Sequence, residues 1–250
     1  MFIDTHCHLS MLDYDDIDEI VENNISNNIS IMIVSGCSKD SIYESLELSK
    51  KYKIVYLTLG YHPSEASTTT KEDLDELKKL LMNDKVVGVG EIGLDYHYGK
   101  EDRDKQIELF EEQLKIADEL FLPVVIHSRD ATLDTIEILK KHSAKGVIHC
   151  FSGSIETALQ YVKMGFKLGI GGVVTFKNSK LYEVVKAVGL DNIVLETDSP
   201  YLTPEPYRGQ KNSSKYIPII AKKIADICDT DVDNVATITT NNARSVYDIK

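Results

Sequence analysis

Short apolar runs rich in β-branched residues alternate along the whole chain with longer stretches of helical periodicity. Strands that are apolar throughout and separated by helices pair in parallel and are buried on both faces. Eight such runs have strand length, at residues 1–5, 29–34, 54–59, 86–90, 123–126, 146–148, 166–170 and 193–195. The helical patterns lie at 15–27, 40–51, 71–82, 102–120 and 130–141, and weaker ones at 154–164, 179–188 and 216–228.

Eight strand and helix units predict a closed barrel rather than an open sheet. The 250 residues match the length of about 250 at which one (β/α)8 barrel closes. The alternative, an open doubly wound sheet, commonly carries a glycine-rich phosphate loop, and neither GxGxxG nor GxxxxGK[ST] occurs. We therefore expect a single α/β domain over residues 1–250, folded as a TIM-type (β/α)8 barrel.

Charge and composition exclude several classes of protein. With 28 basic and 40 acidic residues the net charge is −12, which disfavours holding long nucleic acid by its phosphates. The four cysteines form no CxxC pair, so neither a disulfide framework nor a thiolate zinc site is indicated. No apolar run approaches the roughly 18 residues of a membrane span, no targeting segment precedes the first strand, and nothing signals an obligate protein partner. A cytoplasmic location is expected.

Polar residues that can bind metal follow the predicted strands, one strand end after another. His6 and His8 flank Cys7, and alternation along a strand directs both imidazoles into the barrel. A single histidine at a strand end is more often a hydrogen-bonded core residue than a ligand, but four imidazoles and two carboxylates buried together require a cation. Barrel enzymes place such groups at one mouth. The predicted metal ligands are His6, His8, Glu91, His127, His149 and Asp198.

Several longer motifs surround these residues. They are Phe2-Ile3-Asp4-Thr5-His6-Cys7-His8, Gly60-Tyr61-His62-Pro63, the segment 88–96, the segment 123–129, His149-Cys150-Phe151-Ser152-Gly153, the segment 196–202 and Asn242-Ala243-Arg244. Together they resemble, nearly end to end, the TatD family of metal-dependent deoxyribonucleases in the amidohydrolase superfamily. The sequence departs from the family pattern after Asn212, where Ser213 and Ser214 replace the expected acidic or proline residues.

The resemblance implies hydrolysis of DNA phosphodiesters at a centre of two divalent cations. It implies that His6, His8 and Asp198 hold the first metal, that His127 and His149 hold the second, and that Glu91 bridges them. The position of Glu91 also supports a bridging role. Many superfamily members bridge their metals with a carbamylated lysine of the fourth strand, and Glu91 follows the fourth predicted strand here. The family is often described as magnesium-dependent, whereas a ligand set with so many imidazoles is better suited to zinc, manganese or cobalt. The identity of the metal is left open.

Two cations about 3.5–4 Å apart would lower the pKa of a shared water and polarise the phosphoryl oxygen. Asp198 is then the expected general base, with Glu91 as the second catalytic residue. The residues expected to bind substrate phosphate are His62, Arg129, Arg208, Lys211 and Asn212. A loop-capping role for His62, and a salt bridge from Arg129 to Asp130 or Asp95, are the alternatives.

Three functions fit these observations. The first is removal of nucleotides from the ends of DNA strands, and the second is hydrolysis of another ester such as aminoacyl-tRNA at the same metals. The third is a non-catalytic metal-binding or interaction scaffold, which the complete ligand set disfavours. Asp4 is expected to orient His6, and His97 and His142 are expected to be surface residues.

Overall fold

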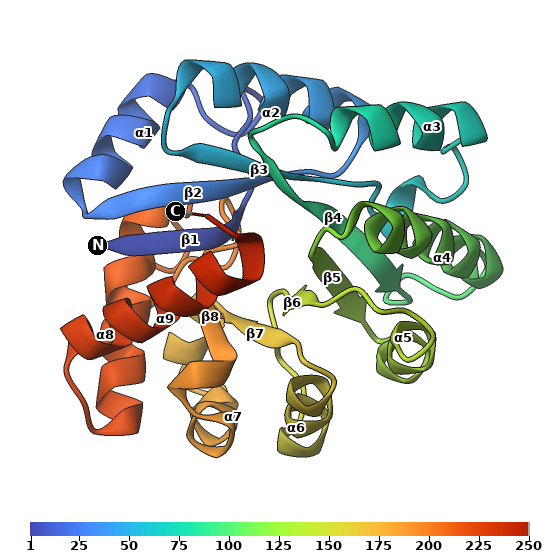
Figure 1. Ribbon diagram of the computed structural model, residues 1–250. Helices are drawn as coiled ribbons and strands as arrows, with labels where there is room; N and C mark the ends of the chain where they lie inside the picture. Colours follow the sequence, from blue (N-terminus) through green and yellow to red (C-terminus); the bar gives the residue numbers. More distant parts are fainter. Residues whose placement is uncertain (250) are drawn as a thin grey trace.

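The eight strands of the computed structural model, which describes residues 1–249, form one parallel sheet in the order β1 to β8. β8 lies beside β1, where Asp198 N donates to His6 O at 3.0 Å and His8 N donates to Ser199 O at 2.7 Å. The predicted (β/α)8 barrel is therefore confirmed (Figure 1). The strands are β1 Phe2–Cys7, β2 Ile29–Gly36, β3 Val55–Leu59, β4 Val86–Asp95, β5 Val124–Arg129, β6 Gly146–Ile148, β7 Lys167–Ile170 and β8 Ile193–Leu195.

Helices surround the sheet, and each of the predicted helical stretches forms one. Ser38 and Thr70 begin α2 and α3 with capping boxes, which satisfy the first free N–H groups of these helices. Within residues 1–249, no helix is long and apolar enough to cross a membrane. The helices are α1 Ile17–Ser26, α2 Lys39–Lys51, α3 Lys71–Leu80, α4 Arg103–Leu120, α5 Thr132–Leu139, α6 Ile155–Lys163, α7 Leu181–Val188, α8 Ile217–Cys228 and α9 Val232–Tyr247, with short 3-10 turns η1 Pro63–Glu65, η2 Gly172–Thr175, η3 Leu190–Asn192 and η4 Ser214–Tyr216.

Helix α9, which was not predicted, lies against β1 and β8 (Figure 1). Its residues Ala243 and Tyr247 pack with Ile3, Ile31 and other apolar side chains of the barrel interior. Asn242 Nδ2 donates to the carbonyls of Leu190 and Ile193 at 2.8 Å each. The helix thus covers the end of the barrel at which the strands begin, and the polar groups gather at the opposite end.

Strands β4 and β5 extend beyond the predicted ends at residues 90 and 126. They remain paired as far as Asp95 and Arg129, with a register shift between Val89 and Ile92. Gly93 has a φ of +145°, and a Cβ there would lie 1.9 Å from His127 O. Glycine is therefore needed where β4 passes the backbone of a predicted metal ligand.

Candidate metal centre

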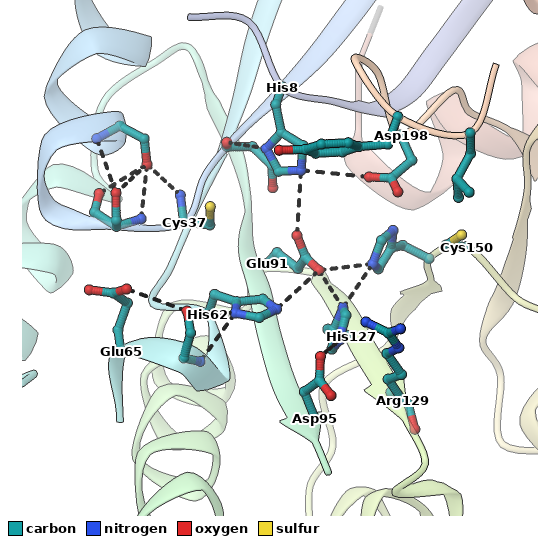
Figure 2. Close-up of a pocket in the computed structure, with 18 of the residues that line it drawn as sticks. His8, Cys37, His62, Glu65, Glu91, Asp95, His127, Arg129, Cys150 and Asp198 are labelled. Carbon is teal, nitrogen blue, oxygen red and sulfur yellow. Dashed lines mark hydrogen bonds and ion pairs between the residues drawn. The ribbon is translucent and has the colours of Figure 1, made fainter. Parts of the chain in front are cut away.

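The six predicted metal ligands lie together at the carboxyl ends of the strands. Figure 2 labels four of them, His8, Glu91, His127 and Asp198, with Glu91 in the middle. Glu91 Oε1 is 2.6 Å from His127 Nδ1 and 2.9 Å from His149 Nε2. Its other oxygen, Oε2, is 3.5 Å from His6 Nε2 and 3.7 Å from His8 Nε2. The Glu91 carboxylate therefore stands between two pairs of imidazoles.

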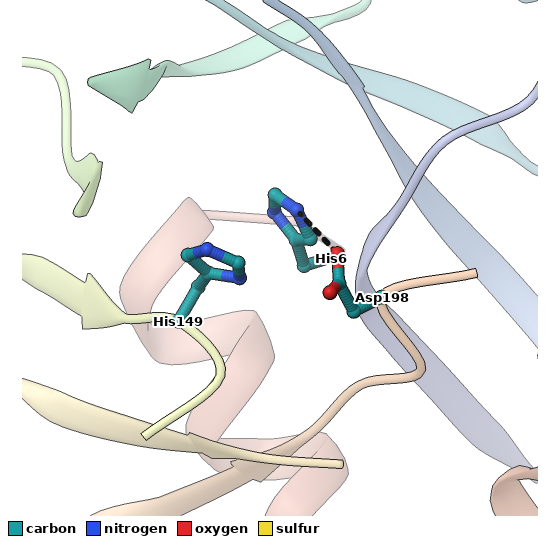
Figure 3. A group of neighbouring side chains, drawn as sticks. All are labelled: His6, His149 and Asp198. Carbon is teal, nitrogen blue, oxygen red and sulfur yellow. Dashed lines mark ion pairs between the residues drawn. The ribbon is translucent and has the colours of Figure 1, made fainter. Parts of the chain in front are cut away.

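Asp198 faces the first of these pairs. Its Oδ1 atom is 3.6 Å from His6 Nε2 and 3.6 Å from His8 Nε2. The ring of His6 also lies beside the ring of His149, with centroids 4.1 Å apart (Figure 3). His6 and Glu91 thus link the two halves of the cluster.

The buried imidazole of His6 shows that these residues fit a cation. Neither ring nitrogen of His6 has a hydrogen-bond partner in the described part of the chain, and neither does His149 Nδ1. Leaving such groups buried and unsatisfied costs about 1–3 kcal/mol each. The 3.5 and 3.6 Å separations from His6 Nε2 to Glu91 and Asp198 exceed hydrogen-bond lengths, and a set of imidazole and carboxylate ligands is the kind that binds zinc and related divalent ions.

The charges in the cluster are fixed by burial and by neighbouring groups. Burial lowers the pKa of His6 well below its usual value, and His149 lowers it further, so His6 is neutral. Burial acts to raise the pKa of Glu91, but His149 and His127 outweigh it and hold that pKa well below the usual range. A neutral imidazole and an ionised carboxylate are the forms that bind metal.

Two ligand histidines are held by a hydrogen bond on the ring nitrogen that faces away from Glu91. His127 Nε2 donates to Asp95 Oδ2 at 3.1 Å, which directs Nδ1 into the cluster (Figure 2). His8 Nδ1 donates to the Ser35 carbonyl at 3.3 Å and leaves Nε2 facing Asp198. This arrangement of outer hydrogen-bond partners is typical of metal-binding histidines.

Asp95 and Glu196 are site residues that the sequence analysis missed. Asp95 belongs to the part of β4 that continues past its apolar run. The buried carboxylate of Glu196 lies 3.8 Å from His149 Nδ1 and accepts from Cys150 N at 2.5 Å. Burial raises the pKa of Glu196 to about 8. Asp95 belongs to the family motif at 88–96, and this motif is the one feature of the sequence that points to it.

Asp95→Ala is expected to weaken divalent metal binding about 10- to 100-fold, because His127 loses the partner that orients its ring. Titration calorimetry with Mn²⁺ measures this change, and circular dichroism should show a folded barrel. Asp130→Ala is the matched control, since Asp130 pairs with His97 at 3.1 Å outside the cluster. An unchanged affinity of Asp95→Ala for Mn²⁺ would show that Asp95 does not orient His127.

Of the residues expected to bind substrate, His62 and Arg129 line the cavity above the cluster. His62 Nε2 is 3.9 Å from Glu91 Oε1, while its Nδ1 accepts from Ser64 N at 3.1 Å and so also caps η1. Arg129 lies 5.7 Å from the centre of the Tyr98 ring. In residues 1–249 it forms no ion pair with Asp130 or Asp95, the alternative considered from the sequence.

The other three predicted substrate residues do not line this cavity. Lys211 Nζ donates to the Asp13 carbonyl, and the Arg208 guanidinium lies 4.0 Å from the centre of the Phe176 ring. For Asn212 the expectation is corrected, because the residue is buried and its amide donates to the carbonyls of Thr197, at 2.9 Å, and Tyr201, at 2.5 Å. Its side chain holds the loop after β8 together.

Two further expectations are also corrected. Asp4 does not reach the imidazole of His6, because its carboxylate accepts from Thr197 Oγ1 at 2.6 Å and from Thr197 N at 3.1 Å. It joins β1 to the segment after β8. His142 is not a free surface residue, since its side chain is only 10% exposed and Nδ1 lies 2.7 Å from Asp118 Oδ2.

The cluster forms part of the wall of a cavity of about 840 Å³. This volume lies at the upper end of the range for small-molecule sites. Tyr98 and Tyr201 stand on its edge with 88% and 59% of their surface exposed. A barrel with this cluster at the carboxyl ends of its strands defines the class of the protein, a metal-dependent hydrolase.

Comparison with known proteins identifies the family within this class. The family model described as "TatD related DNase" matches residues 3–248, and the chain belongs to this family. It is 41% identical over 254 residues to the uncharacterized metal-dependent hydrolase YabD of Bacillus subtilis, covering 100% of both chains. It is 32% identical to the uncharacterized metal-dependent hydrolase YcfH of Escherichia coli, covering 99% of this chain and 96% of the relative.

A solved structure agrees with these matches. The crystal structure of YjjV, a TatD homolog from Escherichia coli, superposes with a TM-score of 0.93 and 30% identity. The superposition covers 100% of this chain and 98% of the other. The solved structure thus supports both the barrel fold and the family assignment.

Proposed function

We propose that this protein hydrolyses phosphodiester bonds of DNA at strand ends, using two divalent cations. The observation that carries the proposal is the cluster itself, in which buried His6 has no hydrogen-bond partner among the described residues and faces two carboxylates on the wall of a large cavity. Membership in a family described as TatD related DNase supports DNA as the substrate. The cytoplasmic location expected from the sequence stays a prediction.

We assign the six ligands to two sets that share Glu91, as the family resemblance implies. His6, His8 and Asp198 would hold one cation, and His127 and His149 the other, with Glu91 shared between them. When bound, such a pair of cations lowers the pKa of water and polarises a phosphoryl oxygen. Zinc, manganese and magnesium are the metals to be tested.

Asp198 is assigned the proton transfer. Its Oδ1 atom faces His6 and His8, and its carboxylate is 16% exposed and borders the cavity. The second oxygen, Oδ2, is assigned to the attacking water. That oxygen accepts a proton from the attacking water and later returns it toward the leaving oxygen. His62 and Arg129 donate to the phosphate oxygens.

The rim of the cavity favours a nucleic acid end over a small ester. Exposed Tyr98 and Tyr201 offer ring faces on which bases stack, and base stacking on an aromatic side chain contributes about 1–3 kcal/mol. Arg129 adds a positive charge with no carboxylate partner in the described chain. A net charge of −12 opposes wrapping of long duplex, so a single strand entering by its end is the preferred substrate.

The test uses metal-loaded protein and end-labelled single-stranded DNA, duplex DNA, an aminoacyl-tRNA and a model phosphodiester. We expect stepwise shortening of single-stranded DNA in Mn²⁺, Zn²⁺ or Mg²⁺, and complete loss of activity in chelator. Release of the amino acid without shortening of DNA would favour the other ester. Turnover of no substrate by protein that contains metal would support a scaffold instead.

A further inference from the structure

Arg208, in the loop between β8 and α8, is held in place by an aromatic ring rather than by an acid. Its guanidinium lies 4.0 Å from the centre of the Phe176 ring. No carboxylate of residues 1–249 pairs with it, whereas Arg103 pairs with Asp134 at 2.8 Å. The chain has 40 acidic and 28 basic residues, so an unpaired arginine beside a catalytic cavity is informative. The ring face attracts the guanidinium, and the N–H donors of Arg208 form no ion pair among the described residues, so they can bind a ligand.

Arg208 and Phe176 line a second cavity of about 330 Å³. Lys177, Asn178 and Ser179 line it too, and Lys177 has no carboxylate partner within the described chain. Its one acid, Glu205, forms no ion pair with either cation there. The second cavity therefore offers two positive charges and several hydrogen-bond donors at its surface.

The second cavity is next to the cavity that holds the metal ligands. Val173, in η2, lines both the cavity that holds the metal ligands and the cavity beside Arg208. It also lines a third recess of about 580 Å³, which contains Lys180 and Ser154. A substrate strand that leaves the metal ligands on the side of η2 would therefore pass close to Arg208.

We propose that Arg208, supported by Lys177, binds a phosphate of the DNA strand other than the one that is hydrolysed. The inference rests on the proposed function and deepens it, because it makes the substrate an oligonucleotide rather than an isolated phosphodiester. The planar guanidinium can donate two parallel hydrogen bonds to a phosphate, and its contact with the Phe176 ring keeps it at the second cavity. Arg208 selects for strand length and takes no part in the reaction itself.

The experiment compares wild type, Arg208→Ala and Arg208→Lys on thymidine oligonucleotides of increasing length and on bis(p-nitrophenyl) phosphate. We expect Arg208→Ala to lose about 10- to 100-fold in kcat/KM on long oligonucleotides, mainly through KM, and nothing on the small diester. The kcat/KM of Arg208→Lys on long oligonucleotides should lie between those of wild type and Arg208→Ala, since lysine keeps the positive charge but lacks the planar guanidinium. The slope of log kcat/KM against log salt should fall by about 0.7 for each lost phosphate contact.

Lys163→Ala is the control for charge alone, because Lys163 is exposed on α6 and lines none of the three cavities. It should match wild type on every substrate. An equal loss on the small diester would place Arg208 at the reacting centre, and no loss on any DNA would remove the subsite. If wild type cleaves the diester but no DNA, the proposed function and the subsite both fail. Cleavage of DNA that is indifferent to Arg208 overturns the subsite alone.

Discussion

Asp198→Asn is expected to lower the turnover of DNA about 10²-fold or more, while metal content falls much less. Asparagine keeps the shape of the side chain and one oxygen toward His6 and His8, both 3.6 Å from Asp198 Oδ1. It cannot accept the proton of the attacking water at the second position. Steady-state kcat of metal-loaded protein, with metal content from emission spectroscopy of the same sample, measures the two quantities together.

Asp13→Asn provides the matched control for this substitution. Asp13 also lines the cavity, but its carboxylate accepts from Ser10 Oγ at 2.9 Å and belongs to none of the candidate metal groups. This variant should keep turnover within a few-fold of wild type. If metal-loaded Asp198→Asn also turned over near the wild-type rate, the proton would leave by another route and the assignment to Asp198 would be wrong.

The barrel could be predicted because its strands are apolar on both faces. Runs such as 29–34 and 193–195 carry this pattern without help from distant residues, and all eight predicted strands are present. Helix α9 could not be predicted by the same means, because it follows α8 without an intervening strand and lies outside the repeating unit. Its place is decided by tertiary packing, where Tyr247 fills the end of the barrel beside Ile3.

The metal ligands could be predicted from the sequence more completely than the residues around them. His127 follows an apolar run directly and Asp198 stands three residues after one, so their position at the mouth could be predicted from strand ends. Asp95 could not be predicted in this way, because its apolar run ends at Gly90 and only the family motif at 88–96 includes the five further residues of β4. Asn212 and Arg208 belong to the long loop after β8, which folds back so that the first is buried and the second lies on Phe176. Whether such a loop residue is buried or exposed depends on tertiary contacts, which the local sequence pattern does not show.

Metal affinity is expected to rise at least 10-fold per pH unit between pH 7 and about 9, with about two cations bound per chain, because His127 holds a proton there and the pKa values of His8 and His149 are raised as well. Burial acts to lower the pKa of His127, but its hydrogen bonds to the carboxylates of Asp95 and Glu91 outweigh burial and raise that pKa to about 9. The metal-free protein therefore holds a proton on His127 at pH 7, where an ordinary histidine with a pKa near 6.5 is mostly neutral. A cation binds the neutral ring and must displace this proton, so affinity increases as pH rises toward the pKa and levels off above it. Calorimetry with Mn²⁺ from pH 6.5 to 8.5, in buffers of different ionisation enthalpy, measures both affinity and proton release.

The source of this pH dependence can be separated from general effects of pH. Asp95→Ala removes one of the two hydrogen bonds that raise the pKa of His127, so in that variant the levelling-off should move to lower pH and proton release at pH 7 should decrease. His62 is a useful reference, because burial lowers its pKa to about 4 and it stays neutral throughout the range. His62→Gln should therefore leave the slope unchanged. An affinity that is flat from pH 7 to 8.5 in the wild type would show that His127 carries no proton for the metal to displace, and the proposed state of the metal-free cluster would be wrong.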